Sequence, residues 1–142
     1  MNCEMKIDKL SILIPAYNEA KTIHLILDKV KEVELINKIQ KQIIIVNDCS
    51  SDQTKEVIEN YIAEHPTLDI QLFNQAVNMG KGAAIHKAIE LASGQFLVVQ
   101  DADLEYDPEE FNILLSPIVN GFADVVYLSL IHISEPTRQP TI

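Results

Sequence analysis

The clearest structural signal in this chain is the stretch QFLVVQDADLE, residues 95–105. Its apolar run Phe96–Val99 predicts a short buried strand. Acidic side chains then follow at alternating positions, as Asp101, Asp103 and Glu105. Alternate side chains of an extended chain point the same way, so we expect these carboxylates to converge just beyond the carboxyl end of the strand.

Carboxylates this close repel one another and raise one another's pKa, and a divalent cation relieves that conflict. Mg²⁺ and Mn²⁺ prefer oxygen ligands, and Mg²⁺ is usually held by one or two carboxylates together with substrate phosphates. Asp101, Asp103 and Glu105 are therefore predicted metal ligands. The alternative is a solvated acidic loop, and an Asp-x-Asp pattern alone does not decide between the two.

Length and composition indicate one ordinary globular domain. The chain has 142 residues, of which 47% are hydrophobic and 23% are charged. Its net charge of −10 argues against nonspecific nucleic-acid binding and against a polybasic membrane patch. Cys3 and Cys49 make no disulfide framework, so we expect reduced thiols and a cytoplasmic location, which for a longer protein includes the cytoplasmic face of a membrane. No signal peptide or membrane-length apolar run is present.

Predicted strands and helices alternate along the chain. Short apolar runs predict strands at 11–15, 42–46, 70–73, 96–99 and 123–127. Between them, apolar residues at helical spacing predict four helices, whose apolar stripes are Ile23–Val33, Val57–Ile62, Ile85–Ala92 and Phe111–Ile118. This order predicts an α/β fold with a parallel sheet, right-handed crossovers and helices on both faces.

Polar and special residues mark the expected helix ends. The expected N-caps are Asn18, Asp52 or a neighbouring serine, and Asp107, the last followed by Pro108 at the first helical position. Ser93–Gly94 is expected to end the third helix with a glycine C-cap. His65-Pro66 is expected to end the second helix, and Pro117 is expected to end or kink the fourth.

Ligands of such sheets bind beyond the carboxyl ends of the strands. The unusual polar residues fall at those ends: Tyr17, Asn18, Glu19, Asp48, Asp101 and Asp103. We therefore expect one binding edge that gathers side chains from several loops.

Four motifs in this chain together resemble the family 2 glycosyltransferases: Pro15–Glu19, Val46–Thr54, Asn78–Ala84 and Asp101–Asp103. Each motif is weak alone, whereas their order and spacing are specific. The likeness runs from about Leu10 to Tyr127, and Glu105 with Asp107-Pro108 favours the polyprenyl-phosphate (dolichyl-phosphate) mannosyl- and glucosyltransferases. It implies a Rossmann-like GT-A fold with a mostly parallel sheet.

The resemblance also implies a nucleoside-diphosphate sugar donor, UDP-glucose or GDP-mannose, a Mg²⁺ or Mn²⁺ ion, and a polyprenyl-phosphate acceptor. The residues that it implies for nucleotide binding are Pro15, Ala16, Tyr17, Glu19, Asp48, Lys81 and Asp101, with Asp101, Asp103 and Glu105 as metal ligands. It assigns no catalytic residue within this chain. One departure is Asn47, where relatives commonly carry a first aspartate before the residue equivalent to Asp48.

Other nucleotide-binding and phosphate-binding classes fit less well. Gly80-Lys81-Gly82 lacks the P-loop spacing, and no Gly-x-Gly-x-x-Gly follows the first strand. A phosphoacceptor receiver domain would carry acids after its first and third strands, where this chain has Pro-Ala-Tyr and Asn-Gln. A non-catalytic nucleotide-binding fragment remains an alternative. Single residues have plainer roles too: Glu19 as a first-turn helix charge, Asp48 as a turn-former, Lys81 as a solvated charge and Tyr17 as a core-edge aromatic.

The end of the sequence departs from the family pattern. Relatives usually continue the last strand with Gly-Ser-Arg, whereas Leu128–Arg138 reads as a transposon-based sequencing adapter translated in one frame. We therefore expect residues 1–127 to be the nucleotide-sugar-binding part of a GT-A domain and residues 128–142 to be a non-native tail. We expect such a fragment to bind the donor without transferring the sugar.

Overall fold

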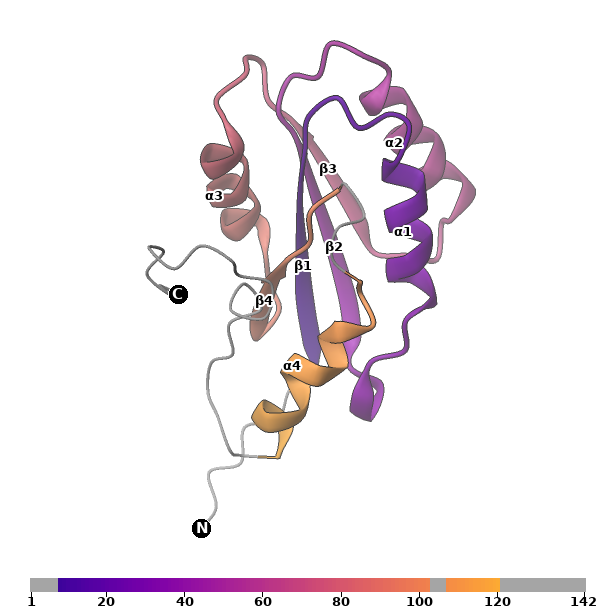
Figure 1. The fold of residues 1–142 in the computed structure, drawn as a ribbon, viewed down its shortest axis with the longest axis vertical. Helices are drawn as coiled ribbons and strands as arrows, with labels where there is room; N and C mark the ends of the chain where they lie inside the picture. The colour runs from indigo at the N-terminus through magenta and orange to yellow at the C-terminus, as the bar shows by residue number, and fades with distance from the viewer. Residues whose placement is uncertain (1–7, 103–106, 121–142) are drawn as a thin grey trace.

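A computed structural model of the chain describes residues 8–102 and 107–120. Asp103, Glu105, the strand expected at 123–127 and the tail at 128–142 lie outside these ranges. The described residues form a parallel sheet of four strands in the order β3-β2-β1-β4 (Figure 1). The strands are β1 (Lys9–Ala16), β2 (Gln40–Asn47), β3 (Ile70–Asn74) and β4 (Phe96–Val99).

Helices connect the strands as the alternation predicts. They are α1 (Ile23–Glu32), α2 (Thr54–Glu64), α3 (Lys81–Leu91) and α4 (Glu110–Val119), with a short 3₁₀ helix η1 (Ile36–Lys38) before β2. The predicted α/β class and parallel sheet are confirmed. None of the helices within 8–102 and 107–120 combines the length and the apolar character that a membrane span requires.

The two central strands are apolar on both faces because both faces are covered by helices. Alternate side chains of β1 and β2 separate into two cores. One face of the sheet packs against α1, α2 and α4 through Ile12, Ile14, Ile43 and Ile45. The other packs against α3, where Leu13, Ile44 and Val46 meet Ala84 and Ala88. Small alanines on α3 let that helix lie close to the sheet.

The connection from β3 to β4 places the N-terminus of α3 at the carboxyl edge of the sheet, where ligand binding is expected. These strands lie at opposite edges of the four-stranded sheet, so the chain between them crosses over β2 and β1 and carries α3 on the face away from α1 and α2 (Figure 1). As a result, the N-terminus of α3 lies at the carboxyl edge of the sheet, beside the loops that follow β1 and β2. Gly80 precedes this helix with φ of 96°, a conformation that favours glycine.

Several predicted helix ends are wrong. Asn18 does not cap α1: it has φ of 53°, and α1 begins only at Ile23, after Thr22. Gly94 does not close α3 in the left-handed conformation, since Gly80 is the glycine with positive φ among the described residues. Gly94 is required for space instead, because a Cβ there would lie 2.7 Å from Ser11 Oγ and 2.8 Å from the carbonyl oxygen of Lys9.

The predicted N-caps of α2 and α4 are also wrong, whereas the predicted C-terminal ends of these two helices are confirmed. Gln53, not Asp52, is the N-cap of α2, although Asp52 accepts a 2.9 Å hydrogen bond from the backbone N–H of Thr54; the helix ends at Glu64, just before His65. Glu109, not Asp107, is the N-cap of α4, so Pro108 is not its first residue; Asp107 Oδ1 accepts a 3.0 Å bond from the backbone N–H of Glu109 before the helix begins. Pro117 lies in the last turn of α4, which ends two residues later at Val119.

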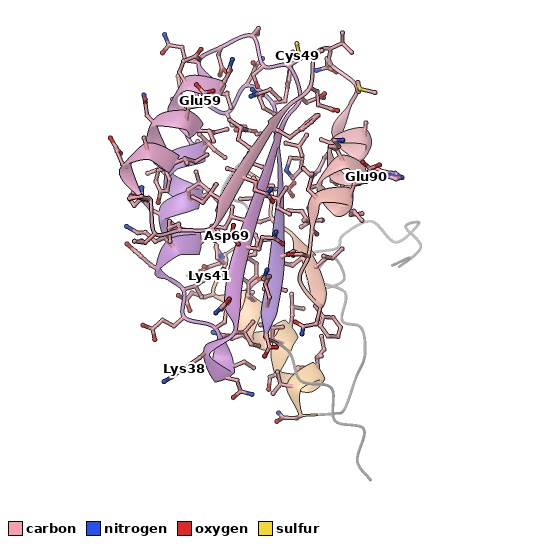
Figure 2. The ribbon with its side chains drawn as sticks, turned by 180° about the vertical axis from the view of Figure 1, so that it is seen from behind. Lys38, Lys41, Cys49, Glu59, Asp69 and Glu90 are labelled. Atoms are coloured by element: carbon pink, nitrogen blue, oxygen red, sulfur yellow. The ribbon has the colours of Figure 1, made fainter. Side chains whose placement is uncertain are left out.

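Lys41 closes the C-terminal end of α1 from the neighbouring strand β2. Its Nζ donates to the carbonyl oxygens of Val30, Lys31 and Val33 at 2.7, 2.8 and 2.7 Å. A cation is favoured at this end of a helix because carbonyl groups there lack intrahelical partners. Burial lowers the pKa of Lys41, and the charge of Glu34 opposes that shift. Figure 2 shows Lys41 toward the end of the sheet opposite Cys49, which lies at the carboxyl edge.

Candidate functional site

A pocket of about 360 Å³ opens at the carboxyl edge of the sheet. Its walls come from the loops after β1, β2 and β4 and from the start of α3. All seven residues expected to hold the nucleotide line it: Pro15, Ala16, Tyr17, Glu19, Asp48, Lys81 and Asp101. Of the three expected metal ligands, Asp101 lies in the pocket, and Asp103 and Glu105 lie outside the described residues. The size suits a small-molecule ligand.

The loop after β1 is held in place by the loop after β2. The backbone N–H of Asp48 donates to the carbonyl oxygen of Ala16 at 2.9 Å. Asn18 bridges the two loops with its side chain, because its Oδ1 accepts bonds from the backbone N–H of Ser51 at 2.8 Å and of Asp52 at 3.3 Å. These bonds explain why an asparagine with positive φ stands here, and they leave Tyr17 at the pocket wall with 48% of its surface exposed.

Asp48 is the most heavily bonded acid of the pocket. It is only 4% exposed. Its Oδ1 accepts hydrogen bonds from the backbone N–H of Met79 at 2.7 Å and from Gln75 Nε2 at 3.2 Å, and its Oδ2 accepts one from the backbone N–H of Gly80 at 2.8 Å. Asp48 thus fixes the segment that leads into α3, a structural role in addition to the expected contact with a base.

Asn47, the departure from the family pattern, is buried and structural. Its Nδ2 donates to Asn74 Oδ1 at 2.9 Å, which joins the ends of β2 and β3. Its Oδ1 accepts from both the backbone N–H and the hydroxyl of Ser50. The side chain is 3% exposed and is not part of the pocket lining. In this chain the side-chain amide of Asn47 therefore stabilises the loop after β2 and does not line the pocket.

Lys81 and Asp101 form an ion pair across the pocket. Lys81 Nζ lies 2.6 Å from Asp101 Oδ1. The lysine side chain is 61% exposed and the aspartate side chain 17% exposed, so the lysine retains room to move while the carboxylate is held. Lys81 is the first residue of α3, whose N-terminal end carries partial positive charge. The pocket thus combines one cation, a helix N-terminus and three acids, Glu19, Asp48 and Asp101.

The described part of the chain contains no group of three or more histidine, cysteine or acidic side chains that would bind a metal ion by itself. Asp101 nevertheless suits a hard divalent cation, since Mg²⁺ is commonly held by one or two carboxylates together with the phosphates of a substrate. The carboxylate oxygen that Asp101 supplies to the pocket therefore fits a cation that binds together with a diphosphate.

Sequence reasoning missed four pocket residues, Asn78, Gly80, Ala84 and Ala102. Three of them lie in the quoted motif Asn78–Ala84, so the signal was present without a residue assignment. Asn78 Nδ2 donates to the carbonyl oxygen of Asp48 at 3.3 Å. Ala102, by contrast, is an apolar residue between two acids, and nothing in its side chain indicates that the residue lines a pocket.

Solved structures of glycosyltransferases share this fold. A mannosyltransferase from Pyrobaculum calidifontis, in complex with GDP-Man and Mn²⁺, superposes with a TM-score of 0.65 at 26% identity, over 75% of this chain and 30% of that chain. TarS from S. aureus, in complex with UDP, gives a TM-score of 0.68 at 26% identity, over 79% of this chain and 32% of that chain. The GT-A, Rossmann-like architecture is thereby established for the described residues.

Curated proteins give the same assignment. A dolichyl-phosphate beta-glucosyltransferase of Trichomonas vaginalis is 41% identical over 110 residues, which are 74% of this chain and 33% of that protein. A dolichol-phosphate mannosyltransferase of Pyrococcus furiosus is 28% identical over 80% of this chain and 31% of its own length. The chain thus spans about a third of the curated relatives that it matches. The model of the family "Glycosyl transferase family 2" matches residues 11–141, and this chain belongs to that family.

Proposed function

We propose that the pocket binds the nucleoside diphosphate of a sugar donor together with Mg²⁺ or Mn²⁺, and that the whole protein transfers a hexose from UDP-glucose or GDP-mannose to a polyprenyl phosphate. The observation that carries the proposal is that the seven residues expected to hold the nucleotide, which come from four separate segments of the sequence, line a single pocket. The relatives, which include dolichyl-phosphate glycosyltransferases, support the substrate class.

The diphosphate is assigned to the side of the pocket that holds Lys81 and the N-terminus of α3. A lysine ammonium and the free N–H groups of a helix start are both favourable partners for phosphate oxygens. Lys81 is mostly exposed and reaches Asp101 at 2.6 Å, so its ammonium can turn from that carboxylate to a phosphate with little desolvation. Gly82 adds no side chain there, and a Cβ on it would meet nothing within 4 Å.

The nucleoside is assigned to the part of the pocket formed by the loops after β1 and β2. Tyr17 is half exposed at the pocket wall and offers an aromatic face to a base. Asp48 Oδ2 accepts one bond, from Gly80, so it keeps acceptor capacity for a ring N–H of uracil or guanine. Since Asp48 also holds the segment leading into α3, base binding and diphosphate binding would share this carboxylate.

The cation is assigned to Asp101, with Asp103 and Glu105 as proposed further ligands outside the described residues. When bound, a divalent cation offsets the negative charge that develops on the departing diphosphate. Asp101 would contribute one carboxylate oxygen, and Lys81 would contribute a second positive charge on the diphosphate. A phosphate acceptor is already ionised near neutral pH, so it needs little help from a general base.

Titration calorimetry of this chain with UDP, GDP and their sugars, with and without Mn²⁺, tests the proposal. We expect one nucleotide to bind with a clear dependence on Mn²⁺. Asp101→Asn should weaken that binding by about tenfold, which corresponds to ~1.4 kcal/mol. Glu59→Gln is the matched control, because it makes the same chemical change on α2, away from the pocket (Figure 2). Binding of neither nucleotide, or an Asp101→Asn variant with unchanged affinity, would refute the proposal.

A further inference from the structure

Thr22 stands at the N-cap position of α1 but does not cap it. Its backbone has φ of −121° and ψ of −17°, outside the helix, and its side chain makes no capping hydrogen bond. A threonine at this position normally accepts a bond from an N–H group of the first helical turn and so stabilises the helix. Here the hydroxyl is engaged elsewhere, which indicates a role other than helix stability.

The hydroxyl of Thr22 reaches the segment that follows β4. Thr22 Oγ1 lies 3.0 Å from the carbonyl oxygen of Ala102 and 3.0 Å from Glu19 Oε1, with the single hydroxyl hydrogen shared between these two acceptors. Thr22 is not among the residues that line the pocket, whereas Glu19 and Ala102 are. Any effect of Thr22 on a bound ligand would therefore pass through its two partners.

Among the described residues, anchored neighbours flank Asp101 on both sides after β4 ends. The backbone N–H of Gln100 donates to the carbonyl oxygen of Leu13 at 2.8 Å, which continues the pairing of β4 with β1. Two residues further along the chain, the bond from Thr22 holds the carbonyl of Ala102, and the methyl group of Ala102 is buried in the core. Asp101 lies between these two anchored residues, so its carboxylate is placed by both of them.

The same threonine joins this segment to the other pocket loops. Glu19, which shares the Thr22 hydroxyl, donates its backbone N–H to Thr54 Oγ1 at 2.8 Å. The hydroxyl of Thr54 in turn donates to Asp52 Oδ1, and Asp52 Oδ2 accepts a 3.3 Å bond from the backbone N–H of Ala20. A chain of hydrogen bonds therefore runs from the loop after β2, through the loop after β1, to the loop after β4.

We propose that Thr22 is a positioning residue for the donor site: through the carbonyl of Ala102 it fixes the Asp101 carboxylate in the place where a cation held by a nucleoside diphosphate is bound. The proposal rests on the proposed function, because it assumes that Asp101 contacts that cation. It assigns to Thr22 a larger effect on cation-dependent than on cation-independent nucleotide binding, because its bond to Glu19 bears on both and its bond to Ala102 bears on the Asp101 carboxylate.

The test compares Thr22→Val, which keeps the shape and removes the hydroxyl, with Thr22→Ser, which keeps the hydroxyl. We expect Thr22→Val to weaken UDP or GDP binding by about 3- to 10-fold with Mn²⁺ present and by a smaller factor without Mn²⁺, while Thr22→Ser restores wild-type affinity. In NMR spectra of the ligand-free chain, the ¹³C shift of the Ala102 carbonyl should move in Thr22→Val and return in Thr22→Ser. Thr67→Val is the control for removing an exposed threonine hydroxyl.

The outcomes separate this inference from the proposed function. A wild-type chain that binds neither nucleotide with Mn²⁺ refutes the proposed function, and the role of Thr22 falls with it. A wild-type chain that binds, together with a Thr22→Val variant that binds equally well or a Thr22→Ser variant that binds as weakly as Thr22→Val, overturns the inference alone. If Thr22→Val does not fold, as judged by thermal unfolding, Thr22→Ala takes its place in the same comparison with Thr22→Ser.

Discussion

The ammonium nitrogen of Lys81 lies 2.6 Å from Oδ1 of Asp101, so the first residue of α3 and the loop after β4 are joined by an ion pair inside the pocket. The two residues are separated by the whole of α3 and β4 in the sequence, and the crossover brings them together. Such a pair lets the lysine neutralise the carboxylate that we assign to the cation. Lys81 would then compete with a cation for Asp101 and cooperate with it on a diphosphate.

Lys81→Gln should therefore change two affinities in opposite directions. Binding of Mn²⁺ alone should strengthen by about 2- to 5-fold because a competing charge is removed, and binding of UDP or GDP without metal should weaken by about the same factor, as expected for a mostly exposed charge. Electron paramagnetic resonance measures free Mn²⁺, and calorimetry measures nucleotide binding. Lys87→Gln, on the same helix and paired with Glu90 at 3.4 Å, is the control. Two changes in the same direction would contradict the competition.

Asp48→Asn should destabilise the fold as well as weaken nucleotide binding. The substitution replaces one acceptor oxygen by an amide NH₂, which would face a backbone N–H group of Met79 or Gly80. Leaving a buried donor without an acceptor costs about 1–3 kcal/mol in the free energy of unfolding. Urea denaturation measures this loss. Asp69→Asn, an exposed aspartate shown in Figure 2, makes the same change at the surface, and a loss of equal size there would count against the proposed anchoring.

Two glycine substitutions should have opposite effects on stability. Gly94→Ala places a Cβ 2.7 Å from Ser11 Oγ and 2.8 Å from two backbone atoms, which cannot move freely, so we expect a loss of about 1–3 kcal/mol. Gly82→Ala places a Cβ in α3 with nothing within 4 Å, so we expect a gain of about 0.4–1 kcal/mol. Each variant serves as the control for the other in thermal or urea unfolding. A stable Gly94→Ala variant would show that β1 and this turn are less tightly packed.

The stability contributed by Asp52 should depend on pH. Asp52 is exposed; slight desolvation raises its pKa, but hydrogen bonds from Thr54 and from the backbone N–H of Ala20 outweigh that effect and hold the pKa below its ordinary value. The folded-state pKa is thus lower than the unfolded-state pKa of about 4, so the contribution is complete above about pH 4 and is lost as the pH falls through the folded-state value.

Asp52→Asn removes this titration. The difference in unfolding free energy between wild type and the variant should be larger at about pH 6 than at about pH 3. Urea unfolding at both pH values measures it, with Asp69→Asn as the matched control on an exposed aspartate. A difference that stays constant with pH would show that the carboxylate charge contributes nothing through its bonds to Thr54.

Much of the fold could be predicted because both central strands are continuous apolar runs and each helix carries an apolar stripe. The apolar character of these strands alone predicts that they are buried, as the structure shows for Ile12, Ile14, Ile43 and Ile45. Helix ends were harder to predict. Asn18 fits the side-chain preferences of an N-cap, yet tertiary bonds to Ser51 and Asp52 determine its conformation, and such bonds between distant loops leave no local pattern. Gly94 likewise has a packing cause that depends on β1.

The pocket residues were predictable where a motif names side chains, as for Tyr17 and Asp48. The roles of backbone groups were not. Ala102 lines the pocket, and its carbonyl accepts the bond from Thr22, although an alanine offers no polar side chain to notice. The sequence also did not predict that Asp48 anchors the segment before α3. That role depends on the tertiary approach of this segment, whose Met79 N–H lies 2.7 Å from the Asp48 carboxylate.

The ammonium group of Lys41 has all three of its hydrogens donated to carbonyl oxygens at the end of α1. Its bonds must open before the nitrogen can lose a proton and attack an electrophile, so Lys41 should react slowly with an acylating reagent while the protein is folded. Mass-spectrometric footprinting would then provide a built-in indicator of structural integrity: labelling of Lys41 would report that α1 and β2 have come apart, and exposed Lys38 would report the reagent dose (Figure 2).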